Sequence, residues 1–248
     1  MHNLESDIPI FLGSIPITNL SKEKITQTIL FCARNKCLLR VHLCNAFTLV
    51  SAERDLDLKY ILQQSHMNIP DGKGVFFALR KKGLRSNFRG MDLLDSVFST
   101  SGTSRLTHFM FGGIHGDEFA FISRLQNSNH KVIVKVPPFV SDIQQLDIIS
   151  LVSEINNSKA NIVWLGIGTP KQDKLVAQLS NHLKIPIIPV GAVFDFLGGR
   201  QREAPKIFQK AGLEWLYRFL KEPRRLWKRY ILGNLAFIRI IYKNRGFQ

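Results

Sequence analysis

The sequence has few of the features that mark secreted, metal-binding or repetitive proteins. Its 248 residues include only three cysteines, Cys32, Cys37 and Cys44, and no second cluster of Cys and His at zinc-binding spacing. An odd number of closely spaced cysteines favours free, buried thiols in a reducing compartment over a disulfide framework. The absence of an internal repeat and of a low-complexity stretch excludes solenoid and fibrous architectures.

Long hydrophobic runs are also missing. Residues 1–7 are polar and acidic, and the apolar run over residues 8–17 is interrupted by two prolines and a glycine. Because this pattern differs from that of a signal peptide, we expect the protein to stay cytosolic. Residues 230–241 are mostly apolar but include Asn234 and Arg239. That stretch is too short and too polar to cross a bilayer.

Acidic residues are scarce near the C-terminus. Residues 200–248 contain thirteen Lys and Arg against three Glu, which gives +10 of the chain's net charge of +15. Leu213, Leu216 and Leu220 repeat at helical spacing, and a second apolar set continues after Pro223 beside further cations. The pattern predicts two short, basic, amphipathic helices.

Such a segment suits an anionic surface. Basic helices with aromatic residues lie in the headgroup region of anionic membranes, where each cation contributes about 1 kcal/mol. Basic patches also bind nucleic acid or phosphorylated ligands, and a plain helical pair packed on the core is a further alternative. A solvated protein face normally mixes charges of both signs. The sequence therefore favours surface binding.

The rest of the chain alternates predicted strands and helices. Strands are predicted over residues 38–43, 67–70, 108–111, 131–136, 161–166 and 185–190. Helices are predicted after Ser21 and over residues 46–64, 75–80, 91–98, 119–125, 142–156 and 171–183. This alternation indicates an α/β fold with a Rossmann-like, mostly parallel sheet and helices on both faces. We divide the chain into an α/β domain, residues 1–199, and a basic amphipathic C-terminal helical appendage, residues 200–248.

Ligands of parallel sheets bind at the carboxyl ends of the strands. Several predicted strands end at residues suited to such a site: Asn45, Gly72, Gly74, Gly112, Gly113, Phe139, Gly168, Thr169, Gln172, Gly191 and Asp195. A single glycine there has an ordinary role in turning the chain. Together on one edge, with helix N-termini beyond them, these residues favour a nucleotide or another phosphate-bearing ligand.

Asp71 is the best candidate for a catalytic residue. It lies between Pro70, which stiffens the approach, and Gly72, which admits a ligand, so its carboxylate can act as a general base at the sheet edge. The alternative is that Asp71 caps the following helix. Arg89 can bind a carboxylate or phosphate in bidentate fashion, or it can pair with Asp92.

The sequence predicts no metal site. Asp55 and Asp57 form an Asp-x-Asp pattern of the kind that binds metal and nucleotide in many transferases. We place them within a helix, where their carboxylates diverge toward solvent. His42, His108 and the other histidines lack ligand spacing.

These motifs, in this order, resemble the WecG/TagA/CpsF glycosyltransferase family, also called glycosyltransferase family 26. The matching positions are Asn45 and residues 69–75, 89–93, 111–113, 165–174, 191–195, 202–206, 212–218 and 222–225. The most specific are Pro-Lys-Gln at 170–172 and Gly-Leu-Glu-Trp-Leu-Tyr-Arg at 212–218. The resemblance extends over roughly residues 8–240.

The resemblance implies an inverting, metal-independent enzyme of cell-surface polysaccharide synthesis, such as teichoic acid or exopolysaccharide synthesis. It would move a sugar from a UDP-sugar to a polyprenyl-diphosphate-linked sugar, and the sugar would be of the N-acetylmannosamine type, its uronic acid, or a hexose. The family implies no cofactor and no nucleic acid partner. It places the enzyme on the anionic inner face of the cell membrane, which accounts for the basic tail. The oligomeric state stays open, with a homo-oligomer possible.

The resemblance also assigns roles to single residues. Asp71 matches the proposed base, which takes the proton from the acceptor hydroxyl as that oxygen attacks the anomeric carbon. Asn45, Arg89 and Gln172 match positions that line the sugar and diphosphate pocket. Tail cations would close over the diphosphate and stabilise the leaving UDP, as a metal does elsewhere; they match Arg218, Arg225 and Lys228. The substrate-binding candidates further include Gly112, Gly113, Phe139, Gly168, Thr169 and Asp195.

Two departures from the family pattern concern the choice of donor sugar. Leu43 stands where many members have a pocket threonine, and Phe139 stands where a tyrosine is common.

The sequence argues against two rival functions. A Rossmann-type oxidoreductase needs a Gly-x-Gly-x-x-Gly after the first strand, which the sequence lacks. A basic peripheral membrane- or RNA-binding module without catalysis leaves Asp71 and Gln172 without a role.

Overall fold

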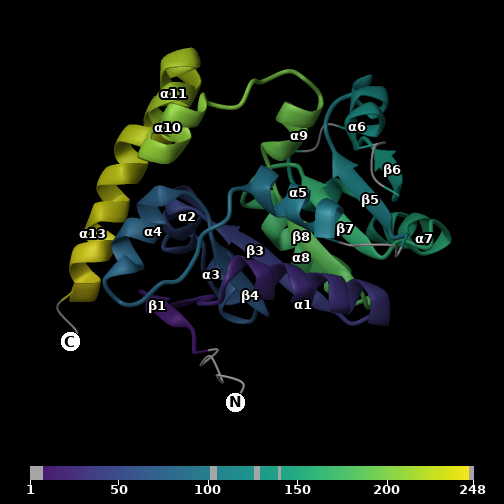
Figure 1. The fold of residues 1–248 in the computed structure, drawn as a ribbon, viewed down its shortest axis with the longest axis horizontal. Helices are drawn as coiled ribbons and strands as arrows, with labels where there is room; N and C mark the ends of the chain where they lie inside the picture. The colour runs from purple at the N-terminus through teal and green to yellow at the C-terminus, as the bar shows by residue number, and fades with distance from the viewer. Residues whose placement is uncertain (1–7, 101–104, 126–128, 139–140, 246–248) are drawn as a thin grey trace. The chain divides into compact units, whose positions relative to one another are not determined.

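The computed structural model describes residues 8–100, 105–125, 129–138 and 141–245, which form two compact units (Figure 1). The first unit comprises residues 1–24, 44–88 and 204–248, and the second comprises residues 25–43 and 89–203. Neither unit is one continuous segment. The expected division after residue 199 concerns function and stays a prediction.

The strands are β1 (Ile10–Leu12), β2 (Ile15–Ile17), β3 (Leu39–Cys44), β4 (Met67–Pro70), β5 (Thr107–Gly112), β6 (Lys131–Lys135), β7 (Ile162–Gly166) and β8 (Pro186–Pro189). The first helices are α1 (Lys22–Asn35), α2 (Ala46–Ala52), α3 (Leu56–Gln63), α4 (Lys73–Arg80), α5 (Gly90–Thr100) and α6 (Asp117–Leu125). The middle helices are η1 (Ile143–Gln145), α7 (Ile148–Asn157), α8 (Lys171–Ser180) and α9 (Val193–Leu197). The C-terminal helices are α10 (Lys206–Ala211), α11 (Glu214–Lys221), α12 (Pro223–Trp227), the π-helical η2 (Lys228–Leu232) and α13 (Gly233–Arg245).

The large sheet confirms the predicted Rossmann-like α/β fold. Its six parallel strands have the order β4-β3-β8-β7-β5-β6, and helices flank the sheet. Within the second unit, Phe109 of β5 lies opposite Val163 of β7 and Ile133 of β6. Parallel pairing places the loops after β5, β7 and β8 at one edge of that unit.

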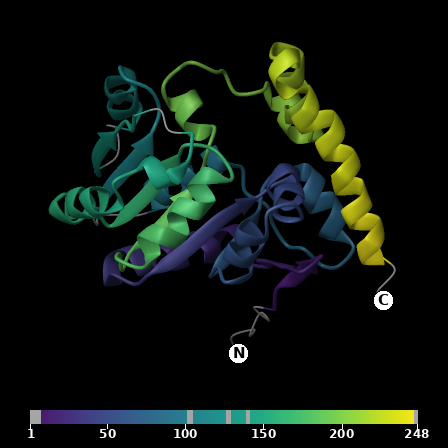
Figure 2. The ribbon, with the colours of Figure 1, turned by 180° about the vertical axis from the view of Figure 1, so that it is seen from behind.

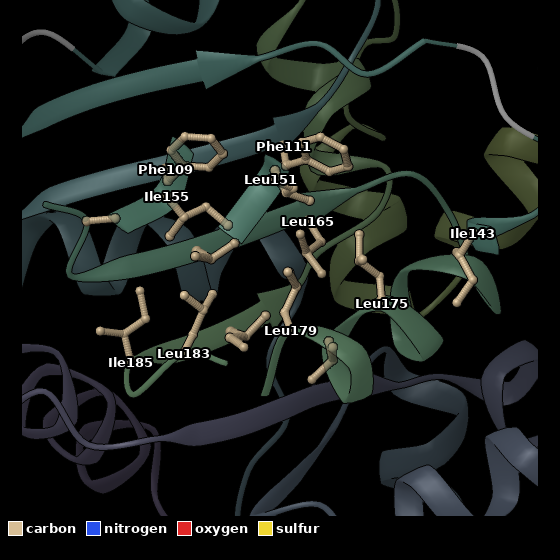
Figure 3. Packing of buried hydrophobic residues seen from close by; sticks show 14 residues of the cluster. Phe109, Phe111, Ile143, Leu151, Ile155, Leu165, Leu175, Leu179, Leu183 and Ile185 are labelled. Atoms are coloured by element: carbon tan, nitrogen blue, oxygen red, sulfur yellow. The ribbon is translucent and has the colours of Figure 1, made fainter. Parts of the chain in front are cut away.

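The second unit is held by a core between its strands and the helices α7 and α8. Phe109, Phe111 and Leu165 come from β5 and β7 and face Leu175 and Leu179 of α8 (Figure 3). Val163, Leu165, Leu175 and Leu179 are fully buried. These strands carry apolar residues in near-continuous runs, as strands buried on both faces do.

The first unit has its own core, and α13 belongs to it. Phe237 of α13 is buried in a cluster with Leu49 of α2, Val75 of α4 and Ile17 of β2. Figures 1 and 2 show α13, in yellow, beside α2 and α4 in both views. The C-terminal segment is therefore anchored by apolar packing within this unit.

Three sequence predictions differ from the structure. The helix predicted over residues 46–64 is two helices, because Asp55 caps a new helix by accepting a hydrogen bond from the Leu58 N–H at 3.0 Å. The helix predicted over residues 142–156 is η1 followed by α7, since Asp147 caps α7 in the same way. After α11, the tail continues from residue 223 to 245 through α12, η2 and α13, longer than the short second helix expected. The sequence analysis also missed the antiparallel β1–β2 pair.

A buried aromatic cluster surrounds His108 at the start of β5. The Trp164 Nε1–H donates to His108 Nδ1 at 3.0 Å, and the Phe98 ring stacks on the imidazole with centroids 4.1 Å apart. Burial, and secondarily the charge of nearby His130, lower the pKa of His108 to about 3. The imidazole is therefore neutral in the folded protein near neutral pH.

We expect this cluster to make the fold acid-sensitive. The folded pKa of His108 lies below its unfolded value near 6.5, so the unfolded state binds more protons between these values. Stability then falls as pH drops from 6.5 toward 3, by at most about 1.4 kcal/mol per pH unit. Urea unfolding at several pH values should show a flatter pH dependence in His108→Phe than in wild type. The exposed His182→Asn variant is the control, and an unchanged slope in His108→Phe would contradict the prediction.

Candidate active site

In the first unit, Asn45 and Asp71 form a hydrogen-bonded pair. Asn45 follows β3 and caps α2, its Oδ1 accepting the Thr48 N–H at 3.1 Å. The Nδ2 of the same side chain donates to Asp71 Oδ2 at 3.1 Å. Both residues are half-buried. The sequence therefore anticipated two residues that the structure joins directly.

The backbone on both sides of Asp71 is fixed. The Asp71 N–H donates to the Cys44 carbonyl at 3.0 Å, and the Phe88 N–H donates to the Pro70 carbonyl at 3.0 Å. The residue that caps α4 is Gly72, so the alternative that Asp71 caps this helix is wrong. Gly72 has φ +78°, and a Cβ there would meet no atom within 4 Å. A carboxylate on a fixed backbone beside open space has the placement that a general base needs.

Arg229 of η2 faces the same region of the first unit. Its guanidinium carbon lies 4.2 Å from the centroid of the Phe47 ring, which belongs to the first turn of α2. Such cation–π contacts contribute about 0.5–2 kcal/mol. Burial lowers the pKa of Arg229, and the charges of Arg218 and Arg225 act in the same direction, whereas Tyr230 and Asp71 raise it.

The sequence predicts that Arg218 and Arg225 of the tail bind substrate, and both lie within electrostatic reach of Arg229. Arg218 of α11 is half-buried. Arg225 of α12 is more exposed, and its Nε donates to Glu222. That hydrogen bond, opposed by burial and helped by the charges of Arg225 and Arg218, lowers the pKa of Glu222. The first unit therefore gathers three guanidinium groups, of which that of Arg229 lies within electrostatic reach of the Asp71 carboxylate.

In the second unit, Gln172 organises the loop after β7. Its side chain is 6% exposed, and its Oε1 accepts the Gly168 N–H at 3.1 Å. Its Nε2 donates to Thr169 Oγ1 at 3.4 Å, and Gly191 of the loop after β8 lies beside the same amide. Gln172, Gly168 and Thr169 thus form one hydrogen-bonded loop, which was predicted as substrate-binding.

The glycines at these strand ends differ in what they face. Gly112 lies opposite Gly166 in the β5–β7 pair, and a Cβ on Gly112 would approach the Gly166 carbonyl oxygen to 2.8 Å. Close backbone packing therefore requires glycine at position 112. Gly168 has φ +85°, and a Cβ there would meet nothing within 4 Å. Gly113 lies against Asp117. Gly168 therefore borders open space, unlike Gly112 and Gly113.

Asp195 takes part in an ion-pair network that the sequence analysis missed. Arg200 donates from Nη2 to Asp195 Oδ1 at 2.7 Å and from Nη1 to Asp117. Asp117 is buried and also accepts the Ile114 N–H at 2.8 Å. Arg200 therefore ties the loop after β5 to the segment after β8.

Arg89 pairs with acids of its own unit. Its Nη1 donates to Asp92 at 3.2 Å and its Nη2 donates to Glu203. The pairing with Asp92 was one alternative from the sequence, and Glu203 is an additional partner. Burial raises the pKa of nearby Asp95, the charges of Glu203 and Asp92 add to this, and Arg89 opposes it. An anionic ligand of Arg89 would compete with these carboxylates.

The other predicted site residue, Phe139, lies outside the described residues. Asp55 is the N-cap of α3, so its expected position within a helix was wrong, whereas Asp57 lies within this helix, in its first turn. Over residues 8–100, 105–125, 129–138 and 141–245, no three His, Cys, Asp or Glu side chains form a group that would hold a metal ion. In the same ranges, no helix is both long and apolar enough to cross a membrane.

Sequence reasoning missed Phe47, Arg229 and Arg200 as parts of these sites. Arg200 and Arg229 are two of thirteen cations in residues 200–248, and nothing in their spacing separates them from the others. The only available signal for Phe47 was its place two positions after Asn45. Tertiary contacts alone distinguish them.

The fold and the candidate site residues are those expected of a transferase. A Rossmann-like parallel sheet carries open, glycine-containing loops that suit a phosphate-bearing donor, and a carboxylate on a fixed backbone lies within electrostatic reach of Arg229. The glycosyl transferase WecG/TagA/CpsF family matches residues 10–248, and the chain belongs to this family. It is a glycosyltransferase, and its family supports a role in cell-surface polysaccharide synthesis.

Proposed function

We propose that this glycosyltransferase moves a sugar with inversion, and without a metal ion, from a UDP-sugar to a polyprenyl-diphosphate-linked sugar. The observation that carries the proposal is the Asn45–Asp71 hydrogen bond beside the open position at Gly72. Inversion requires one displacement at the anomeric carbon, with a base that removes the proton of the attacking hydroxyl. Asp71 has the chemistry for this step.

The reaction divides among the residues as follows. The acceptor oxygen bonds to the anomeric carbon as the bond from that carbon to the UDP oxygen breaks. The acceptor proton passes to the Asp71 carboxylate, and UDP leaves with the additional negative charge. Asn45 holds the carboxylate by donating to Asp71 Oδ2. Arg218 and Arg225 offset the charge on the diphosphate.

The loops of the second unit suit the donor. Backbone N–H groups after β7 and the open space at Gly168 would receive phosphate oxygens close to the main chain. Arg89 would bind a phosphate in place of Glu203, because a guanidinium binds either anion in bidentate fashion. The donor would be an N-acetylmannosamine-type sugar, its uronic acid, or a hexose, and a panel of UDP-sugars would distinguish these.

The C-terminal helices carry an exposed apolar stripe suited to a membrane surface. Its members are Trp227, Ile231, Leu235, Ile238 and Tyr242, each between 44% and 66% exposed. They recur at helical spacing, and exposed Lys228, Arg239 and Lys243 lie along the same helices. Aromatic, aliphatic and cationic side chains in this arrangement bind in the headgroup region of anionic lipid. We propose that the protein is peripheral on the inner face of the cell membrane, where a lipid-linked acceptor resides.

Replacing the base should abolish transfer. We expect Asp71→Asn to lower turnover by about 10²–10⁴-fold, because a positioned base contributes that much. An Asn side chain keeps an acceptor for Asn45 Nδ2, so the fold and UDP affinity should stay near wild type. The assay is sugar transfer from UDP-sugars to a short-chain prenyl-diphosphate-sugar. Asp57→Asn, the same change at an exposed position of the same unit, is the control. Turnover above about a tenth of wild type in Asp71→Asn would remove Asp71 from this role.

Transfer should continue in the presence of a chelator. In our proposal Arg218 and Arg225 offset the diphosphate charge, so EDTA should leave the rate within about twofold of the untreated enzyme. The same assay after dialysis against EDTA measures this. Activity that is lost and then restored by Mg²⁺ or Mn²⁺ would show a metal-dependent reaction instead.

Polar substitution of the stripe should release the protein from membranes. We expect Ile231→Gln with Leu235→Gln to weaken binding to anionic vesicles about tenfold or more, since each buried apolar side chain contributes about 1.5–3 kcal/mol. Turnover with a soluble acceptor should be retained. The pair Leu56→Gln and Ile149→Gln, also at exposed apolar positions, is the matched control. Equal vesicle binding by both pairs would refute the stripe as the membrane contact. Salt-sensitive RNA binding that exceeds vesicle binding would favour the non-catalytic binding module.

A further inference from the structure

Phe47 and Arg229 connect the C-terminal helices to the first turn of α2. The Arg229 guanidinium carbon is 4.2 Å from the centroid of the Phe47 ring. Phe47 follows by two positions the N-cap residue Asn45, whose amide holds Asp71. This contact holds Arg229 against the first turn of α2, and the charge of Asp71 acts on its guanidinium.

Arg229 is held in an unusual environment for a cation. The residue is half-buried, and its Nε is buried without a hydrogen-bond partner among the described residues. Burying a guanidinium group opposes folding unless an opposite charge or a ligand compensates. The carboxylate that acts on Arg229 is that of Asp71, whereas Arg218 and Arg225 repel it.

Arg229 is not needed to attach the C-terminal helices to the first unit. Phe237 of α13 is buried in the core of the first unit, and Ala236, Ile240 and Ile241 pack against the same cluster. An apolar side chain at position 229 would pack on Phe47 without the cost of burying a charge. The charge itself is therefore the feature that needs a function.

We propose that Arg229, stacked on Phe47, is a positioning residue that keeps a fixed positive charge beside the Asn45–Asp71 pair. The guanidinium orients the Asp71 carboxylate and disfavours its premature protonation, while the ring keeps the guanidinium from turning toward solvent. Arg229 stays charged throughout the transfer and gives up no proton. This inference rests on the proposed function of Asp71 as the base, and it adds two residues on which that base depends.

The test separates charge from packing. Arg229→Met keeps a long apolar side chain on Phe47 but removes the charge. We expect its kcat to fall about tenfold or more, with the KM for the UDP-sugar near wild type and a melting temperature equal to or above wild type. Arg224→Met, at an exposed position of α12, is the matched control and should keep the wild-type kcat. A merely structural role predicts the reverse, because methionine packs well and would preserve kcat.

Phe47→Leu tests the ring. Leucine fills the space without offering a π face, so kcat should fall by a factor similar to that in Arg229→Met. The double variant should be no slower than the slower single variant, since both changes remove one arrangement. Arg229→Lys should recover only part of kcat, because an ammonium keeps the charge but lacks the planar stacking surface.

Wild-type transfer activity is measured first, so the two proposals fail in different ways. An inactive wild type, over the whole panel of UDP-sugars, would refute the proposed function. An active wild type with unchanged kcat in Arg229→Met would refute the role of Arg229 alone. Additive losses in the Phe47 and Arg229 variants, or a kcat loss that only follows the loss of melting temperature, would also overturn it.

Discussion

The first unit depends on the double use of the Asn45 amide. The Asn45 oxygen begins α2 by accepting the Thr48 N–H, and the Asn45 nitrogen donates to Asp71. A capping oxygen typically contributes about 1 kcal/mol to a helix, so the start of α2 and the orientation of the carboxylate are linked. The first turn of α2 in turn carries Phe47, on which Arg229 stacks. The helix start and the candidate base thus share the Asn45 side chain, and the tail contact lies in the helical turn that Asn45 caps.

The basic charge of the C-terminal segment has more than one use. Arg200 bridges Asp117 and Asp195 in the second unit, and Arg225 is bonded to Glu222 in the first. Arg229 is stacked and half-buried, whereas Lys228, Arg239 and Lys243 are exposed along a helical segment with an apolar stripe. Salt screens the attraction of exposed cations to an anionic surface beyond a Debye length, whereas partly buried cations are screened less and act strongly on neighbouring groups. In our proposal, one composition therefore serves both a membrane-facing surface and a catalytic site.

Much of the fold was predictable because the apolar residues of its strands and helices follow clear patterns along the sequence. The buried strands β3, β5, β7 and β8 are apolar runs bounded by polar or glycine-rich turns, and a parallel sheet follows from their alternation with helices. Helix ends inside long polar stretches were harder, as at Asp55 and Asp147, where one carboxylate ends a predicted helix and begins the next. Asn45 and Asp71 were found because each follows a strand. Phe47, Arg200 and Arg229 were not, since their significance depends on partners far away in the sequence.

By itself, the sequence determined the α/β class, the strand-end residues Asn45, Asp71 and Gln172, and the basic amphipathic tail, because each is a local pattern of residue types. Tertiary structure decided which of those residues meet. Only packing could show that Asn45 holds Asp71, that the Gln172 amide is used within its own loop, and that Gly112 faces Gly166 rather than open space. Only packing could select Arg229 from thirteen cations in the tail. The physical reason is that a side chain's chemistry is set by its neighbours, and the neighbours here come from distant parts of the chain.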